Sequence, residues 1–261
     1  MNWILYIAAG IGAGTVTGLA GLSAAVVITP LLVGFCGWES YNAVTVALAS
    51  DVLASLFTAY TYQKNKNIDI KRGLMVGIIA LIGTLVGSYS GYLFSQSQPN
   101  GLGYISMLTT IFLGVKFLVK PMNSGLDADS FNANEHKNLK TALAMACGCI
   151  IGWVCGFTGS GGGVLMLTVF TLILGYNLKV AVGTSTLIMF FVALVGAISH
   201  ICLGATVETA PTCLVVITCL VSAVVAARFA NKCNIKRLNR IIGIVLLALG
   251  IVTICSKLLI G

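Results

Sequence analysis

A cluster of glycines interrupts an otherwise apolar stretch in the middle of the chain. The segment 156–163 reads Gly-Phe-Thr-Gly-Ser-Gly-Gly-Gly, with five glycines in eight residues. Glycine is a poor helix residue, so this run predicts a break between two helices, with exposed backbone N–H groups. Lipid tolerates such irregular backbone only where protein surrounds it or where it lines a cavity. The cluster therefore predicts a break that is buried inside a membrane protein.

The composition supports a membrane protein with several spans. Hydrophobic residues make up 58% of the chain and charged residues only 8%. Apolar stretches long enough to cross a bilayer recur along nearly the whole length, and no segment is left over for a soluble domain. The net charge of +8 comes from basic residues at the ends of the apolar stretches, where the positive-inside rule accounts for them. We therefore expect the lipid bilayer as the partner of this chain, and not nucleic acid.

The sequence also matches itself weakly at an offset of 138 residues. The segment 18–23, Gly-Leu-Ala-Gly-Leu-Ser, is a degenerate copy of the glycine cluster, with Gly21 falling on Gly159. The matching positions concentrate around the two glycine segments, which a chance match of generic apolar helices would not do. The chain is thus predicted to hold two copies of one unit, residues 1–120 and 140–261.

Each copy is predicted to contain a glycine-broken helical hairpin followed by three transmembrane helices, which gives an all-α polytopic fold. A linker over 121–139 joins the copies. The first copy holds the hairpin 3–36 and helices 41–62, 71–95 and 101–120, and the second holds the hairpin 140–174 and helices 179–202, 208–230 and 238–258.

The basic residues orient these segments. Loop 63–72 carries four lysines and arginines and is predicted to be cytoplasmic, as is the linker 121–139, whereas loop 96–101 has none and is predicted outside. The basic loop 63–72 corresponds to the uncharged segment 201–207 in the second copy. Corresponding loops therefore lie on opposite sides, which predicts inverted repeats in the cell membrane with both termini outside.

Hairpins that enter from opposite faces can meet near the membrane centre. Each glycine break is followed by the start of a new helix, where free N–H groups and the positive end of the helix dipole suit a small anion. An alternative for the glycines is close helix packing. The residues predicted to bind the substrate are Gly21, Leu22, Ser23, Thr158, Gly159, Ser160, Gly161, Gly162, Gly163, Thr184 and Ser185.

Two titratable residues in apolar segments are unusual. Asp51 falls near the middle of helix 41–62, where a charge is costly and a protonated carboxyl is favoured. It is a candidate for coupling transport to a proton or another cation, and the alternative is a carboxyl that holds a helix contact through a hydroxyl or water. Its match in the second copy is Met189. His200, near the outer end of its helix, is expected to be solvated.

No cofactor or metal site is predicted. The nine cysteines are scattered without metal-site spacing, and no Gly-Lys-Ser/Thr of a phosphate-binding loop follows the glycine cluster. Cys155 stands beside the cluster, either as a packing residue or as a nucleophile or soft ligand. The chain has no paired catalytic groups in its apolar segments, so we do not expect an enzyme.

The second glycine segment resembles a known family. Residues 159–163, an apolar run, and then Val-Ala-Val-Gly-Thr-Ser at 180–185 resemble the TauE/SafE family of sulfite and organosulfonate exporters, also called the toluenesulfonate uptake permease family. That family has a Gly-x-Gly-Gly-Gly segment, an apolar run to a proline, and a Gly-Thr-Ser segment, in two copies. The second copy has Thr168 in place of the proline, and the first keeps Pro30 but lacks the glycine run. The second copy is therefore expected to supply more of the anion contacts.

The resemblance implies a secondary transporter that exports a small sulfur-containing anion such as sulfite or an organosulfonate, for example sulfoacetate or a taurine-derived anion. Alternating access at the hairpin tips would move the substrate. The backbone donors at the breaks predict a small anion but do not indicate sulfur. They leave open a passive anion channel and a thiosulfate or sulfide transporter that uses Cys155. The sequence leaves the oligomeric state open.

Overall fold

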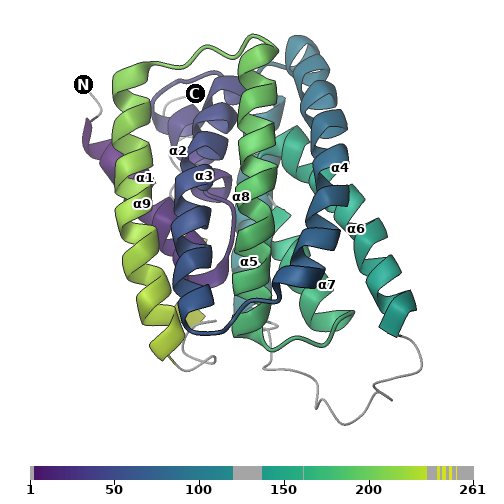
Figure 1. The fold of residues 1–261 in the computed structure, drawn as a ribbon. Helices are drawn as coiled ribbons and strands as arrows, with labels where there is room; N and C mark the ends of the chain where they lie inside the picture. The colour runs from purple at the N-terminus through teal and green to yellow at the C-terminus, as the bar shows by residue number, and fades with distance from the viewer. Residues whose placement is uncertain are drawn as a thin grey trace.

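The computed structural model describes residues 3–119, 137–160 and 162–233, with seven further positions between 240 and 251. The predicted helix 238–258, most of the linker 121–139, and Gly161 lie outside this part of the chain or are covered only at single positions. The described residues form helices and no strands (Figure 1). The helices are α1 (Trp3–Ala20), α2 (Ala25–Phe35), α3 (Ser40–Lys64), α4 (Ile70–Ser97), α5 (Gly101–Val119), α6 (Lys137–Thr158), α7 (Gly162–Leu172), α8 (Leu178–Cys202) and α9 (Thr209–Lys232).

Six of these helices are long and apolar enough to cross a membrane, namely α1, α3, α4, α6, α8 and α9. The helices α2 and α7 have 11 residues each. At about 1.5 Å per residue, each is about 16 Å long, roughly half the thickness of a bilayer core. The fold is therefore that of a multi-pass membrane protein in which two helices are too short to cross alone.

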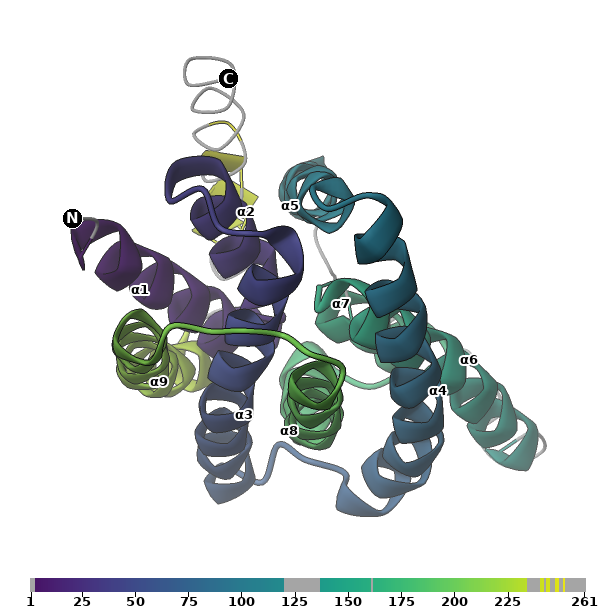
Figure 2. The same cartoon turned by 90° about the horizontal axis from the view of Figure 1, so that it is seen from above.

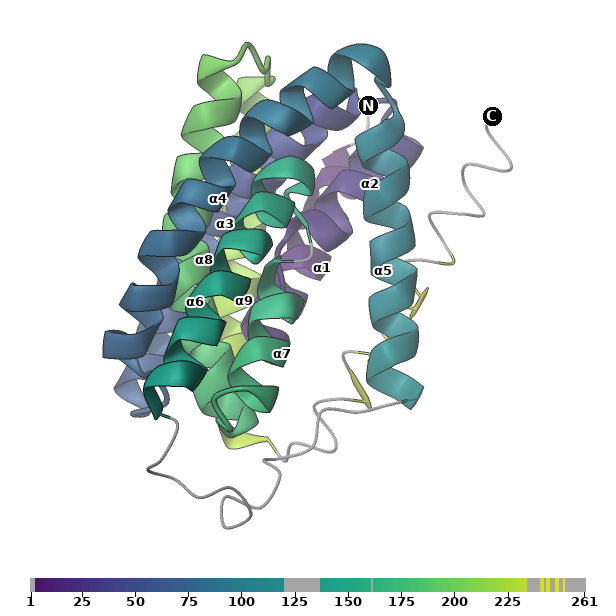
Figure 3. The same cartoon turned by 90° about the vertical axis from the view of Figure 1, so that its right-hand side faces the viewer.

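The helices α3 and α8 lie side by side in the middle of the bundle (Figure 2). On one side of this central pair α1 packs along α9, and on the other side α6 packs along α4. Figures 1 and 3 show that α1 begins and α2 ends at the upper end of the bundle, whereas α6 begins and α7 ends at the lower end. The two broken segments thus reach the interior from opposite ends.

Glycines allow the outer pairs to approach closely. A Cβ atom at Gly14 of α1 would lie 2.0 Å from the carbonyl oxygen of Cys219 in α9. A Cβ atom at Gly152 of α6 would lie 2.0 Å from the carbonyl oxygen of Ala80 in α4. Such small-residue contacts let helices associate through backbone packing where lipid gives no hydrophobic drive. Part of the glycine content therefore serves packing, as the alternative interpretation predicted.

The proline in α2 is accommodated by a hydroxyl from another helix. Pro30 has no N–H, so the carbonyl of Val26, four residues earlier, loses its usual partner within the helix. The hydroxyl of Thr110 in α5 donates to this carbonyl at 2.5 Å. A second hydroxyl, that of Ser106, donates to the carbonyl of Ala25 at 3.1 Å. These bonds fix α5 against α2 without exposing backbone to lipid.

The expectation that His200 is solvated is wrong, because its side chain is fully buried. Its Nε2 lies 3.0 Å from the carbonyl oxygen of Gly156 and its Nδ1 lies 3.3 Å from the hydroxyl of Thr45. Its ring stacks on that of Tyr41, with centroids 4.4 Å apart. Both ring nitrogens therefore have hydrogen-bond partners inside the bundle. These partners offset the cost of burying a polar ring near a helix end.

Candidate functional site

The two glycine breaks contact each other in the interior of the bundle. A Cβ atom at Gly163 would lie 2.2 Å from the carbonyl oxygen of Gly21 and 2.9 Å from the Cα of Leu22. The hydroxyl of Ser23 lies 2.5 Å from the carbonyl oxygen of Gly159. The structure therefore brings together these five residues from two segments that are far apart in the sequence.

Each break is a tight turn of the same form. Gly21 follows α1 with a φ of +65°, and Gly159 follows α6 with a φ of +66°. The N–H of Gly21 donates to the carbonyl of Thr17 at 2.8 Å, and that of Gly159 donates to the carbonyl of Cys155 at 2.7 Å. Glycine adopts this left-handed conformation without steric cost and ends a helix there. After each turn, the next helix begins in contact with the other break.

Asp51 of α3 closes the first break. Its side chain is fully buried, and its Oδ1 accepts a hydrogen bond from the N–H of Ala24 at 2.7 Å. Its Oδ2 lies 2.6 Å from the hydroxyl of Ser23. An N–H group at the start of α2, which has no partner within the helix, is therefore bonded to the carboxyl group of Asp51. Asp51 acts as a helix cap that is supplied by another helix. In this conformation the N–H of Ala24 is therefore not available to a substrate.

The second break has different surroundings. The position on α8 that matches Asp51 is occupied by Met189, whose Cε would lie 3.6 Å from a Cβ atom at Gly162. The Sγ of Cys155 would lie 2.9 Å from the same atom, and it is 4.0 Å from the Sδ of Met189. Among the described residues, sulfur side chains rather than a carboxyl group thus face the start of α7.

A small cavity of about 10 Å³ lies beside the second break. Its lining includes Cys155, Gly162, Ser185 and Met189. This volume is roughly what one water molecule needs. A sulfite or sulfonate does not fit in it, so anion binding here requires the two breaks to move apart.

Thr158 and Ser160 are bonded to each other within the second turn. The N–H of Ser160 donates to the hydroxyl oxygen of Thr158 at 3.1 Å. The two hydroxyl oxygens are 3.2 Å apart, and Ser160 is 1% exposed. These hydroxyls therefore lie at the break, but in this conformation they stabilise the turn.

The two predicted residues on α8 lie in different places. The Oγ of Ser185 would lie 2.9 Å from a Cβ atom at Gly21, so Ser185 contacts the breaks. Thr184 instead accepts a hydrogen bond from the N–H of Asp69 at 3.0 Å, in the α3–α4 connection. Neighbours in the helix point in different directions, so the structure brings Ser185, and not Thr184, to the breaks.

Sequence reasoning missed a polar network at the lower end of the bundle. The hydroxyl of Tyr176, in the α7–α8 connection, donates to the carboxylate of Asp69, and Nη1 of Arg72 donates to the same hydroxyl at 3.2 Å. Burial, reinforced by the Asp69 carboxylate, raises the pKa of Tyr176 to about 12. The network ties the connection before α4 to the connection before α8. The basic residues gave a sequence signal for this end, but nothing in the sequence pairs residues so far apart.

Two polar cavities lie toward the connections and carry different charges. A cavity of about 550 Å³ is lined by Asp69, Lys71 and Arg72, with apolar and hydroxyl groups from α4 and α6. A cavity of about 470 Å³ is lined by Glu39 and Glu208 together with aromatic and polar groups. The first presents two cations and one carboxylate, and the second presents two carboxylates and no cation.

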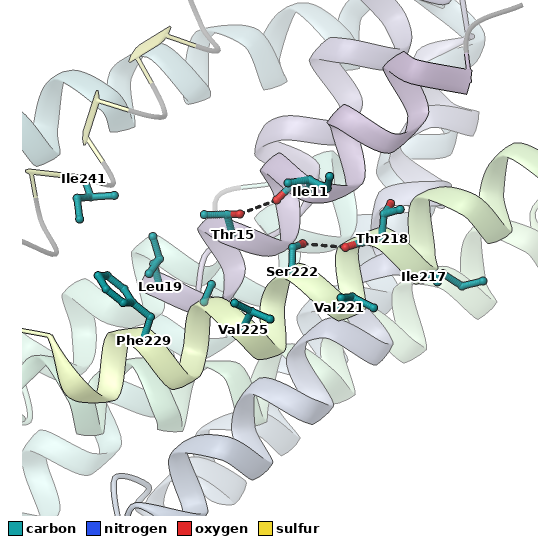
Figure 4. Close-up of a pocket in the computed structure, with 11 residues that line it drawn as sticks. Ile11, Thr15, Leu19, Ile217, Thr218, Val221, Ser222, Val225, Phe229 and Ile241 are labelled. Carbon is teal, nitrogen blue, oxygen red and sulfur yellow. Dashed lines mark hydrogen bonds between the residues drawn. The ribbon is translucent and has the colours of Figure 1, made fainter.

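A cavity of about 670 Å³ lies between α1 and α9 (Figure 4). The hydroxyl of Thr15 donates to the carbonyl of Ile11 within α1 at 2.7 Å. The hydroxyl of Ser222 lies 2.8 Å from the carbonyl oxygen of Thr218 in its own helix and 3.3 Å from that of Gly10 in α1. The remaining lining is apolar, with side chains such as Phe229. The described lining holds no charged group, so it suits hydrocarbon and not an anion.

Comparisons with known proteins agree with a membrane transporter. A family model described as "Sulfite exporter TauE/SafE" matches residues 6–253. "Probable membrane transporter protein YunE" of Bacillus subtilis (strain 168) is 29% identical over 218 residues, which cover 78% of this chain and 80% of that protein. "Probable membrane transporter protein YdhB" of the same organism is 24% identical over 218 residues, covering 84% and 86%. No solved structure matches the chain.

Proposed function

The chain belongs to the sulfite exporter TauE/SafE family, and on that premise we propose that it is a secondary transporter that exports a small sulfur-containing anion. Sulfite or an organosulfonate is the substrate class that the family description supports. The observation that carries the proposal is the contact between the two glycine breaks, because paired helix interruptions at the centre of a membrane protein are typical of transporter binding sites.

We propose further that the two halves are inverted repeats. The hydroxyl of Tyr62 donates to the carbonyl of Gly18 at 3.3 Å, and His200 bonds to the carbonyl of Gly156 at 3.0 Å. Both pairs of positions are related by the same offset of 138 residues. The packing of α1 on α9 and of α6 on α4 follows the same relation. The entry of the two broken segments from opposite ends supports inversion.

The anion is proposed to bind at the second break. The first break already holds the carboxyl of Asp51 at the start of α2, which would repel an anion when ionised and occupies a donor in either state. At the second break the matched position is Met189, and glycines follow one another up to Gly163. Backbone N–H groups at the start of α7, with Ser160 and Ser185 beside them, can approach the oxygens of an anion closely.

Alternating access then requires the breaks to separate. The cavity at the second break holds roughly one water, so the described conformation fits a closed state between two open ones. Basic residues at the lower end, which include Lys71 and Arg72, support a cytoplasmic position for that end in the cell membrane. They would also gather anions there before export. Asp51 is the candidate carrier of a coupled proton or cation.

A second candidate substrate is thiosulfate or sulfide. The observation that favours it is the position of Cys155, whose Sγ lines the small cavity with Met189 and Gly162. A thiol is a polarizable group and a weak S–H donor, so it can contact the exposed sulfur atom of thiosulfate or sulfide, which a sulfonate does not present. The two candidates differ in whether the thiol is needed.

The test is flux of sulfur-35-labelled sulfite, taurine, sulfoacetate and thiosulfate in liposomes that contain the purified protein. We expect the flux of one of these anions to saturate with concentration. We also expect unlabelled anion on the other side of the membrane to accelerate this flux. Flux without saturation or acceleration would instead indicate a channel, and no flux of any of them would overturn the substrate class.

Substitution at the second break should remove the flux. In a Gly162→Leu protein, the side chain would fill the space beside Cys155 and cover the N–H groups of α7. The matched control is Gly77→Ala, because a Cβ atom there meets nothing nearer than 3.5 Å. We expect flux at least tenfold lower in the first variant and unchanged in the second. Full flux in a folded Gly162→Leu protein would contradict a site at this break.

A further inference from the structure

The hydroxyl of Ser23 joins three polar groups in the interior. Its oxygen lies 2.6 Å from Oδ2 of Asp51 and 2.5 Å from the carbonyl oxygen of Gly159. It also accepts a hydrogen bond from the N–H of Ala25 at 3.2 Å. Ser23 is 1% exposed and Asp51 is fully buried. The link from Asp51 to Gly159 therefore runs from α3 through the first break to the second break.

The number of hydrogens at this point is limited. A serine hydroxyl has one hydrogen to donate, and both a carbonyl oxygen and an ionised carboxylate can only accept. Both oxygen–oxygen distances are those of complete O–H···O hydrogen bonds. With Asp51 ionised, the single hydrogen of Ser23 would have to serve both acceptors at once.

A proton on Oδ2 of Asp51 satisfies every group. The acid then donates to Ser23, and Ser23 donates to the carbonyl of Gly159. The other carboxyl oxygen, Oδ1, remains free to accept from the N–H of Ala24, at the observed 2.7 Å. Each short contact thus contains one hydrogen, and no acceptor faces another acceptor.

We propose that a proton bound to Asp51 is part of the contact between the two breaks, so that the protein takes up this proton when the breaks join and releases it when they part. On release, the proton leaves Oδ2 for water and Asp51 becomes an anion. The hydrogen of Ser23 then turns to the carboxylate, and the carbonyl of Gly159 loses its partner. This deepens the proposed function, since it rests on the breaks separating during transport.

The described surroundings of Asp51 supply no positive charge. The titratable groups that face it from other helices in the described part of the chain are the thiols of Cys155 in α6 and Cys219 in α9, both buried. The partners of its carboxyl group are Ser23 and Ala24, and no described lysine or arginine is paired with it. The proton is therefore the cation that this arrangement accommodates.

Infrared spectroscopy of the full-length protein in lipid nanodiscs tests the proton directly. We expect a carbonyl-stretch band of a neutral carboxylic acid that shifts in D₂O, disappears on titration to high pH, and is absent in Asp51→Asn. The control is Glu39→Gln, which removes an exposed carboxyl group and should leave the band. Persistence of the band in Asp51→Asn, or its absence from the folded wild type at every pH, would overturn the proposal.

Hydrogen exchange measured by mass spectrometry tests the consequence for the contact. In the wild type, we expect the amides of residues 159–163 to exchange faster at pH values where the infrared band is lost than at pH values where it is present. After correction for the intrinsic pH dependence of exchange, the increase should be about fivefold, the effect of losing one hydrogen bond. Asp51→Asn keeps a donor to Ser23 and an acceptor for Ala24, so its exchange should not change with pH. In Ser23→Ala, residues 159–163 should exchange rapidly at every pH. A pH-independent wild type would contradict the link.

Neither measurement uses a transported anion. A protein that moves none of the sulfur anions would refute the proposed substrate while leaving both results for Asp51 to be judged independently.

Discussion

The two breaks have almost the same backbone and different chemistry. Gly21 and Gly159 adopt φ values of +65° and +66°, but a carboxyl group meets the start of the helix after the first, and sulfur atoms lie beside the start of the helix after the second. At the first break, Asp51 bonds to the N–H of Ala24. The other is left with small residues and a cavity of about one water. Two turns of the same backbone form can therefore have different chemical surroundings, a carboxyl group at one and sulfur atoms at the other.

The largest effect should come from removing the contact itself. In Gly163→Leu, the new side chain would collide with the carbonyl of Gly21, since even a Cβ atom would lie 2.2 Å from it. We expect a loss of about 3 kcal/mol or more in the free energy of unfolding, together with loss of flux. Thermal unfolding in detergent measures the first and the liposome assay the second.

The control for this change is at the matched position in the first half, Ala25, which already carries a Cβ atom. An Ala25→Gly protein should lose only about 1 kcal/mol, the usual cost of glycine in a helix. Equal stability of Gly163→Leu and the wild type would show that the two breaks do not touch.

The next effect comes from making the second break resemble the first. A Met189→Asp protein places a carboxyl group opposite the start of α7, where it would bond to backbone N–H groups, as Asp51 bonds to that of Ala24 at the first break, and so compete with an anionic substrate. We expect anion flux to fall at least tenfold, while Met189→Leu, which keeps the volume and apolar character, retains it.

Binding measured as a shift of the unfolding temperature with substrate concentration checks the Met189→Asp result without transport. An anion that stabilises Met189→Asp as strongly as the wild type would mean that the substrate binds away from the second break.

The smallest effect should come from Cys155. If the substrate is sulfite or a sulfonate, Cys155→Ala leaves flux within about twofold and costs about 1 kcal/mol for the small cavity. The matched position in the first half is Thr17, whose hydroxyl donates to Ala13 at 3.0 Å, and Thr17→Ala serves as the control. Loss of flux only in Cys155→Ala, with thiosulfate or sulfide as substrate, would replace the first candidate by the second.

Much of this arrangement could be predicted from composition and periodicity. The family and the helical membrane fold are confirmed, because apolar length and glycine content are local properties of a sequence. The asymmetry between the copies was expected from Gly-Leu-Ser in place of a glycine run. The inverted topology, the site residues and the substrate stay predictions.

Other features could not be predicted, because they depend on which side chains meet across the bundle. Asp51 contacts a helix start 27 residues earlier in the chain, and Tyr176 bonds to Asp69, 107 residues away. His200 was misjudged for the same reason, since its partners come from α3 and α6. Sequence periodicity predicts which face of a helix is buried, but not which residues of other helices contact that face.

The crossed packing of α1 on α9 and of α6 on α4 has a consequence for how the protein is made. During synthesis, α1 enters the membrane long before its partner α9 has been made. The glycine face of α1 therefore stays without its partner helix until almost the whole remaining chain has been made. Contacts between residues so distant in sequence form slowly. The first half made by itself should therefore be prone to degradation, and co-expression of the second half as a separate chain should rescue it.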